Sequence, residues 1–190
     1  RAAIAGALEQ WSEHSGLTFE QIGSADKADM VLGMRHEGDH GDECPFGSST
    51  IAHSFFPNEN YPVCPLGELH FNDTYAFTTA WRASSWEPID YQSLALHEIG
   101  HALGLAHSAN NKAVMWKFYV GSRRTLHDDD VAGIQALYGG PPECQPNKTC
   151  ADYAGQCGLK SDGCDTTLNC GCGGDDVCIG SKCIDPCAGV

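Results

Sequence analysis

Apolar residues recur with the period of an α-helix over residues 2–14, where Leu8 and Trp11 fall on one stripe. Two later segments, Leu17–Ile22 and Ala28–Met34, are instead rich in branched and apolar residues, which is typical of strands. The pattern therefore predicts a helix followed by two strands.

A further helical segment carries histidines where a purely structural helix has no need of them. His97 and His101 lie four residues apart, so on a helix their imidazoles share one face and can bind one metal ion. Glu98 lies beside that metal, where its carboxylate can take a proton from a bound water. This spacing predicts a metal-dependent hydrolytic site.

The residues after this helix complete the metal set. Gly104 permits a backbone turn that bulkier residues disfavour, and His107 then returns as a third ligand. Three imidazoles and one open position are typical of a catalytic zinc. The alternative is a polar helix with solvated or core histidines, but at average residue usage a chance match to these five positions has a probability of roughly 10⁻⁷ per starting point.

The HExxHxxGxxH motif at residues 97–107, followed by Met115, resembles the signature of the metzincin metalloproteases, in the matrixin branch. The resemblance runs from Ala2 to about Gly139. It implies an α+β, zincin-like catalytic domain over residues 1–139, with a twisted mixed sheet and three helices. Matrixins carry one more strand before the first helix, so we expect the sheet to lack it here.

A second histidine cluster predicts another metal site. His40, Asp42, His53 and His70 form a set suited to a closed tetrahedral structural zinc, and matrixins carry their structural zinc at the matching positions. The alternative is a solvated acidic loop with scattered histidines.

The neighbouring calcium site of matrixins looks degraded in this sequence. Asn72 and Tyr75 stand where the family has an aspartate and a glutamate, and calcium prefers several hard, anionic oxygen ligands. We expect this calcium site to be lost. We hypothesise a Cys44–Cys64 disulfide that would connect the loops that calcium otherwise ties together. The alternative is two reduced thiols.

The resemblance also implies a cleft for an extended peptide. Thr50–Phe55 matches an edge strand above the cleft, which can pair with a peptide through backbone hydrogen bonds. Ser93 matches a position in the pocket for the side chain after the cleaved bond, and residues 116–126 should form its outer wall. The small Ser93 predicts acceptance of large apolar residues, although a simple surface serine is an alternative. Met115 is expected to be an apolar floor beneath the metal.

Three aspartates are placed to organise helix ends. Asp90 can cap the active-site helix, and Asp129 and Asp130 can complement the N-terminus of the last helix. In matrixins this last pair also anchors buried hydrogen bonds near the methionine turn.

Composition sets the cellular context. The 190 residues carry a net charge of -14, which argues against nucleic acid as a partner, and no apolar run is long enough to span a membrane. Nine of the 11 cysteines lie from Cys144 onward, which points to a secreted protein and an oxidising environment. Residues 140–190 are therefore expected to be a disulfide-stapled module with Cys187 left over, zinc binding by its thiols being the alternative.

The sequence thus predicts a secreted zinc endopeptidase that hydrolyses peptide bonds with a zinc-bound water activated by Glu98. One alternative is a carbohydrate- or surface-binding protein in which the cysteine-rich tail does the main task and the zincin domain is accessory. Another is a zinc-binding scaffold that has lost activity, against which the intact Glu98 argues.

Overall fold

The computed structural model describes residues 1–36, 45–57, 67–81, 86–142, 147–161, 164, 167–172 and 177–184. The chain divides into two compact units, Arg1–Pro141 and Pro142–Val190. Within the described ranges no helix combines the length and the apolar character that a membrane crossing requires.

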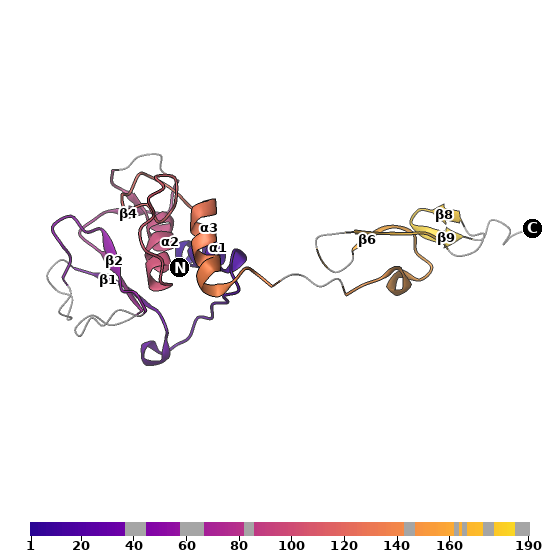
Figure 1. The fold of residues 1–190 in the computed structure, drawn as a ribbon, viewed down its shortest axis with the longest axis horizontal. Coiled ribbons are helices and arrows are strands. Elements are labelled where there is room, and N and C mark those ends of the chain that lie inside the picture. Colours follow the sequence, from indigo (N-terminus) through magenta and orange to yellow (C-terminus); the bar gives the residue numbers. More distant parts are fainter. Residues whose placement is uncertain are drawn as a thin grey trace, which may run out of the picture. The chain divides into compact units, whose positions relative to one another are not determined.

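In its described residues the first unit is α+β with three α-helices and a mixed sheet, which confirms the predicted fold class (Figure 1). Its elements are α1 (Ala2–Glu13), η1 (Ala25–Lys27), β1 (Val31–Arg35), β2 (Ala52–Ser54), β3 (Glu68–Asn72), β4 (Phe77–Thr78), β5 (Ile89–Asp90), α2 (Tyr91–Ala102) and α3 (Asp128–Tyr138). The sheet order is β1-β3-β2, with β1 parallel and β2 antiparallel to β3. Strands β4 and β5 form a separate parallel pair.

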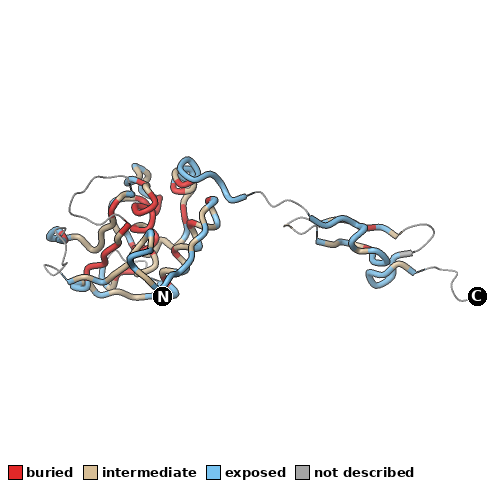
Figure 2. Tube along the Cα trace, turned by 90° about the horizontal axis from the view of Figure 1, so that it is seen from below, coloured by how far each residue is buried: buried red, intermediate tan, exposed pale blue. Residues whose placement is uncertain are grey.

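Helix α2 lies in the middle of this unit and packs against α1 as well as against strands β2 and β3 (Figure 1). A helix that is apolar on most sides is stable only when it is buried, and Leu94, Leu96 and Ile99 are at most 7% exposed. Trp11 of α1 is fully buried, and its indole Nε1 donates to the Leu96 carbonyl at 3.0 Å. The buried residues gather around this helix (Figure 2), so α2 is a rigid base for its side chains.

The predicted strand at Leu17–Ile22 is wrong, because this segment is irregular. Its apolar side chains Leu17 and Phe19 pack against the core, which explains the strand-like composition. The backbone of Leu17 is bound by side chains at the end of α1: its N–H donates to Ser15 Oγ at 3.2 Å, and its carbonyl accepts from Ser12 Oγ at 2.8 Å. A strand requires a hydrogen-bonded neighbour, and no described strand pairs with this segment.

The second predicted strand, Ala28–Met34, begins later than expected, at Val31, and ends at Arg35. Pairing decides its limits, because Val31 is the first residue in register with β3, opposite Glu68. The predicted first helix is confirmed as α1.

The second unit consists of short hairpins held by disulfides. Its elements are η2 (Cys150–Tyr153), β6 (Gly158–Ser161), β7 (Thr167–Cys170), β8 (Val177–Ile179) and β9 (Lys182–Ile184). Disulfides join Cys150 to Cys170, Cys157 to Cys178 and Cys172 to Cys183, and Cys164 is also disulfide-bonded. Cys157 and Cys170 are the buried hydrophobic residues of this unit among those described. The prediction of a disulfide-rich region is therefore confirmed, and the described cysteines form disulfides in place of zinc-binding thiols.

Two cysteine predictions fall outside the described residues. Neither member of the hypothesised Cys44–Cys64 pair is described, and neither is Cys187. Both stay predictions.

Candidate active site

Helix α2 begins as the sequence predicted. Asp90 is its N-cap, and the carboxylate accepts hydrogen bonds from the backbone N–H groups of Gln92 and Ser93. The chain leaves α2 at Gly104, whose φ of +97° lies in the left-handed region that favours glycine. The helix and this turn together set the positions of the three predicted zinc ligands.

The structure brings His97, His101 and His107 together, with one ring nitrogen of each within 4.8 Å of the others. The Nε2 atoms of His101 and His107 are 3.2 Å apart. Two nitrogens bound to one tetrahedral zinc at about 2.0–2.1 Å would lie roughly 3.3 Å apart. The spacing of this donor set therefore fits zinc.

Backbone carbonyls fix the orientation of two of these rings. His97 Nδ1 donates to the Val114 carbonyl at 2.8 Å, and His101 Nδ1 donates to the Leu105 carbonyl at 2.7 Å. In a neutral imidazole with its proton on Nδ1, the Nε2 atom carries the lone pair. Both Nε2 lone pairs are thus available to a metal ion.

Burial also keeps the histidines neutral. It is the largest cause lowering the pKa of His97, and it lowers the pKa of His101 to about 4. The pKa of the more exposed His107 is lowered as well, by burial and then by the charge of Lys117. Neutral imidazole is the form that binds zinc.

Glu98 lies next to this cluster and is 5% exposed. Burial raises the pKa of its carboxyl, opposed by the neighbouring His101 and by a hydrogen bond from Ser54. Ser54 Oγ, from strand β2, donates to Glu98 Oε2 at 2.9 Å. Sequence reasoning missed this Ser54 contact, because it joins residues 44 positions apart. A carboxylate with a raised pKa, held by one oxygen, is suited to accept a proton.

The methionine turn packs under α2, as expected. Met115 is 2% exposed, and a Cβ added to Gly100 would collide with the Met115 sulfur. Only glycine at position 100 therefore allows this packing. The sequence alone does not reveal this requirement, because it arises from the contact between α2 and the methionine turn. Met115 supports the helix from the core and lies outside the lining of the cleft.

Asp130 fixes the methionine turn from α3. Its buried carboxylate accepts from Val114 N at 2.8 Å and Met115 N at 3.0 Å, and also from His127 N at 2.9 Å. Because the Val114 carbonyl accepts from His97, the carboxylate acts through the turn on a predicted zinc ligand. Asp129 is exposed and accepts instead from Ser108 Oγ at 2.6 Å.

A cavity of about 790 Å³ lies over the histidines and Glu98. Residues 49–54 border it, and they include strand β2 (Ala52–Ser54) at one edge of the described sheet. The strand predicted at Thr50–Phe55 is therefore present but shorter than expected. Residues 116–121 and Arg123 border it as well, as expected for the outer wall. Ser93 also lines it, but its Oγ accepts from Arg123 N at 2.7 Å, so this serine binds the wall and is 5% exposed.

Half of the predicted structural zinc set is described. His53 and His70 are opposite each other across β2 and β3, with His53 Nε2 and His70 Nδ1 3.2 Å apart. His70 Nε2 donates to Glu68 Oε2 at 2.7 Å, so its Nδ1 carries the lone pair when the ring is neutral. His40 and Asp42 lie outside the described residues, and this zinc site stays a prediction.

At the predicted lost calcium site, Asn72 is 2% exposed and its amide joins two segments of the protein. It donates to the Thr50 carbonyl at 3.0 Å and accepts from the backbone and hydroxyl of Thr74 at 3.1 and 2.7 Å. These bonds supply a direct protein link where the family has a calcium ligand. The loss of the calcium site stays a prediction.

A comparison with protein families identifies this arrangement. Residues 1–139 match the matrixin family model. The chain belongs to the matrixin family. Matrixins are zinc metalloendopeptidases, and the histidine triad that holds their catalytic zinc is present here.

Relatives of this matrixin come from distant organisms. Karilysin of Tannerella forsythia is 37% identical over 144 residues, covering 73% of this chain and 28% of karilysin. Matrix metalloproteinase-25 of Mus musculus is 38% identical over 146 residues, covering 73% of this chain and 23% of the relative. Metalloendoproteinase 1-MMP of Arabidopsis thaliana is 38% identical over 143 residues, covering 72% of this chain and 37% of the relative. The chain thus spans between 23% and 37% of the length of these relatives.

Proposed function

We propose that this matrixin is a secreted zinc endopeptidase in which His97, His101 and His107 hold the catalytic zinc and Glu98 is the general base. The observation that carries the proposal is the convergence of three imidazole nitrogens within 4.8 Å beside a buried carboxylate in an open cleft. A zinc ion there would lower the pKa of water and polarise the scissile carbonyl.

The protein's own groups perform the remaining steps. Glu98 takes the proton from the attacking water and delivers it to the leaving amine, so that one carboxylate serves as base and then as acid. Ser54 donates to Oε2 of this carboxylate, so we assign the proton transfer to Oε1. The buried surroundings, which raise the Glu98 pKa, make its carboxylate a stronger base for the first of these two transfers.

The substrate class follows from the cleft. Strand β2 pairs with β3 along one edge, and its other edge can add an extended peptide through backbone hydrogen bonds. Such pairing binds many sequences, and the pocket bordered by Ser93, Leu94 and Val120 would select among them. We therefore propose unfolded or flexible protein segments as substrates, with a large apolar residue after the cleaved bond.

Secretion is part of the proposal because several disulfides hold the second unit. The second zinc, at His40, Asp42, His53 and His70, is a further part, supported by the facing nitrogens of His53 and His70. The family match ends at residue 139 and leaves the role of the tail, including carbohydrate or surface attachment, without support from relatives.

Profiling of cleavage products from a peptide library by mass spectrometry tests the proposal. We expect cleavage before large apolar residues, complete inhibition by 1,10-phenanthroline, and recovery when zinc is added back. Cleavage that persists with the chelator would contradict a zinc enzyme. No cleavage by zinc-loaded protein would favour the accessory or inactive zincin alternatives.

A further inference from the structure

We propose that Asp90 is a specificity-determining positioning residue, whose carboxylate fastens residues 116–124 of the outer wall, called the wall below, to the first turn of α2. The inference rests on the proposed function, since a wall selects among peptides only if the cleft binds them. It assigns to the N-cap of the active-site helix a second role in substrate selection.

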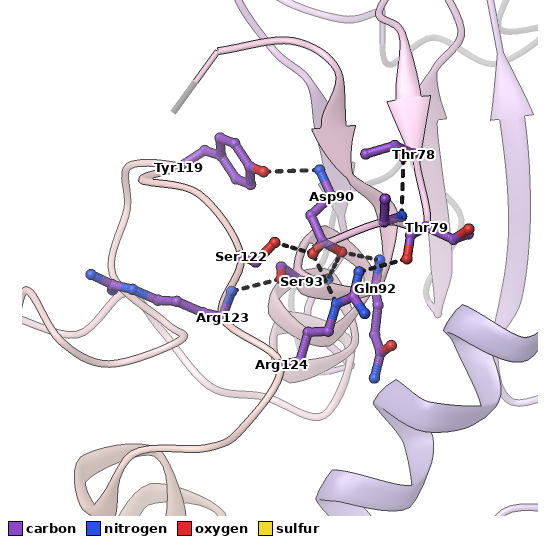
Figure 3. Close-up of polar contacts among 10 residues, drawn as sticks. Thr78, Thr79, Asp90, Gln92, Ser93, Tyr119, Ser122, Arg123 and Arg124 are labelled. Atoms are coloured by element: carbon purple, nitrogen blue, oxygen red, sulfur yellow. Dashed lines mark hydrogen bonds and ion pairs between the residues drawn. The ribbon is translucent and has the colours of Figure 1, made fainter. Parts of the chain in front are cut away.

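The two oxygens of the Asp90 carboxylate have different partners (Figure 3). Oδ1 accepts from the backbone N–H groups of Gln92 at 3.0 Å and Ser93 at 3.2 Å, which is the helix cap. Oδ2 accepts from Ser122 Oγ and from Arg124 Nε, the latter at 2.8 Å, and both of these residues belong to the wall. One oxygen thus caps the helix and the other holds the wall.

Asp90 is fully buried, which makes these contacts strong. A buried carboxylate is costly unless it is paired and hydrogen-bonded, and here four donors satisfy it, one of which is the charged Arg124 guanidinium. Arg124 is itself 24% exposed and also donates from Nη2 to the Thr79 carbonyl, just after β4, at 2.8 Å. Any movement of the wall would therefore separate a buried ion pair.

Two more wall residues bond to the same helix start (Figure 3). The Asp90 N–H donates to the Tyr119 hydroxyl at 2.8 Å, and Arg123 N donates to Ser93 Oγ at 2.7 Å. The Arg123 guanidinium donates in the other direction, to the Ala113 carbonyl at 2.6 Å and the Asn111 carbonyl at 2.5 Å. The wall is held between the start of α2 and the methionine turn.

This attachment matters for selection because residues 117–124 lie outside any helix or strand. Their positions depend on these side-chain bonds, since no regular ladder of backbone hydrogen bonds fixes them. Tyr119 and Val120 of the wall border the same cavity as Leu94 and His97 of α2. A wall fixed in advance lowers the entropy cost of binding a large side chain, while a small side chain gains little from it.

Asp90→Asn separates the two roles, because asparagine is as good an N-cap as aspartate. Its amide oxygen can still accept from Gln92 and Ser93, but its NH₂ group cannot accept from Ser122 or Arg124. We expect the ratio of kcat/KM for peptides with leucine over alanine after the cleaved bond to fall at least about tenfold. In hydrogen–deuterium exchange of the full chain, residues 116–124 should exchange faster while α2 stays protected.

Ser122→Ala and Arg124→Gln each remove one bond to Oδ2 and should change the ratio in the same direction by less. If Asp90→Asn does not fold, the leucine-to-alanine ratio measured for these two variants tests the proposal in its place. Arg35→Gln on β1 removes an arginine distant from the wall and should leave the ratio unchanged.

Two results would overturn the proposal: an unchanged leucine-to-alanine ratio in the folded variants, or unchanged exchange of residues 116–124 in Asp90→Asn. If wild-type protein cleaves no peptide, the proposed function fails, but the exchange measurement still decides whether Oδ2 holds the wall.

Discussion

Replacing Glu98 with glutamine is expected to lower kcat/KM for peptide hydrolysis by about 10³-fold or more while the bound zinc remains. Glutamine has nearly the same shape and can keep the hydrogen bond from Ser54 to its side-chain oxygen. It cannot take a proton from water at neutral pH. Because Glu98 is not among the clustered nitrogen donors, its loss leaves the metal ligands intact. Hydrolysis of a fluorogenic peptide and the zinc content of the same preparation check both parts.

Glu9→Gln is the matched control, since Glu9 is an exposed carboxylate on α1 and makes the same change of charge. We expect it to keep wild-type activity. Activity of Glu98→Gln within tenfold of wild type would contradict the role of Glu98 as general base. Loss of zinc together with activity would show instead that Glu98 is needed to hold the metal.

Replacing Asp130 with alanine is expected to lower the free energy of unfolding by about 3–5 kcal/mol. The change leaves the N–H groups of Val114, Met115 and His127 without their acceptor, in a site where Asp130 is 2% exposed. Hydrogen bonds to a charged group contribute about 1.5–3 kcal/mol each, and partial access of water offsets some of the loss. Denaturant unfolding followed by circular dichroism measures the effect.

The same variant should weaken zinc binding by about 10- to 100-fold, because the turn positions the Val114 carbonyl that orients His97. Competition with a chelating dye measures this affinity. Asp129→Ala is the neighbouring control. The Asp129 carboxylate is exposed and accepts from Ser108, so we expect its removal to lower the free energy of unfolding by less than about 1 kcal/mol. Equal destabilisation by both variants would contradict the role given to Asp130.

The zinc site was predictable from the sequence because its geometry is mostly local. A four-residue step on a helix places His97 and His101 on one face, and a glycine turn returns His107 within six residues of His101. The N-cap at Asp90 and the role of Asp130 in the first turn of α3 were predictable for the same reason, since such residues act within a few positions of their own chain.

Contacts between distant segments were not predictable in the same way. The strand expected at Leu17–Ile22 has the right composition, but composition does not reveal whether a neighbouring strand is available to pair with it. The bond from Ser54 to Glu98 and the attachment of the wall to Asp90 join residues far apart in the sequence. Serine and arginine are common surface residues, so nothing in the sequence singled out Ser122 or Arg124.

Diffraction from crystals of the full chain at the zinc absorption edge tests the central claim most directly. We predict an anomalous peak at about 2.0–2.1 Å from the Nε2 atoms of His97, His101 and His107. Zinc-loaded crystals without a peak among these three nitrogens, or with His107 turned away from the metal, would contradict the account.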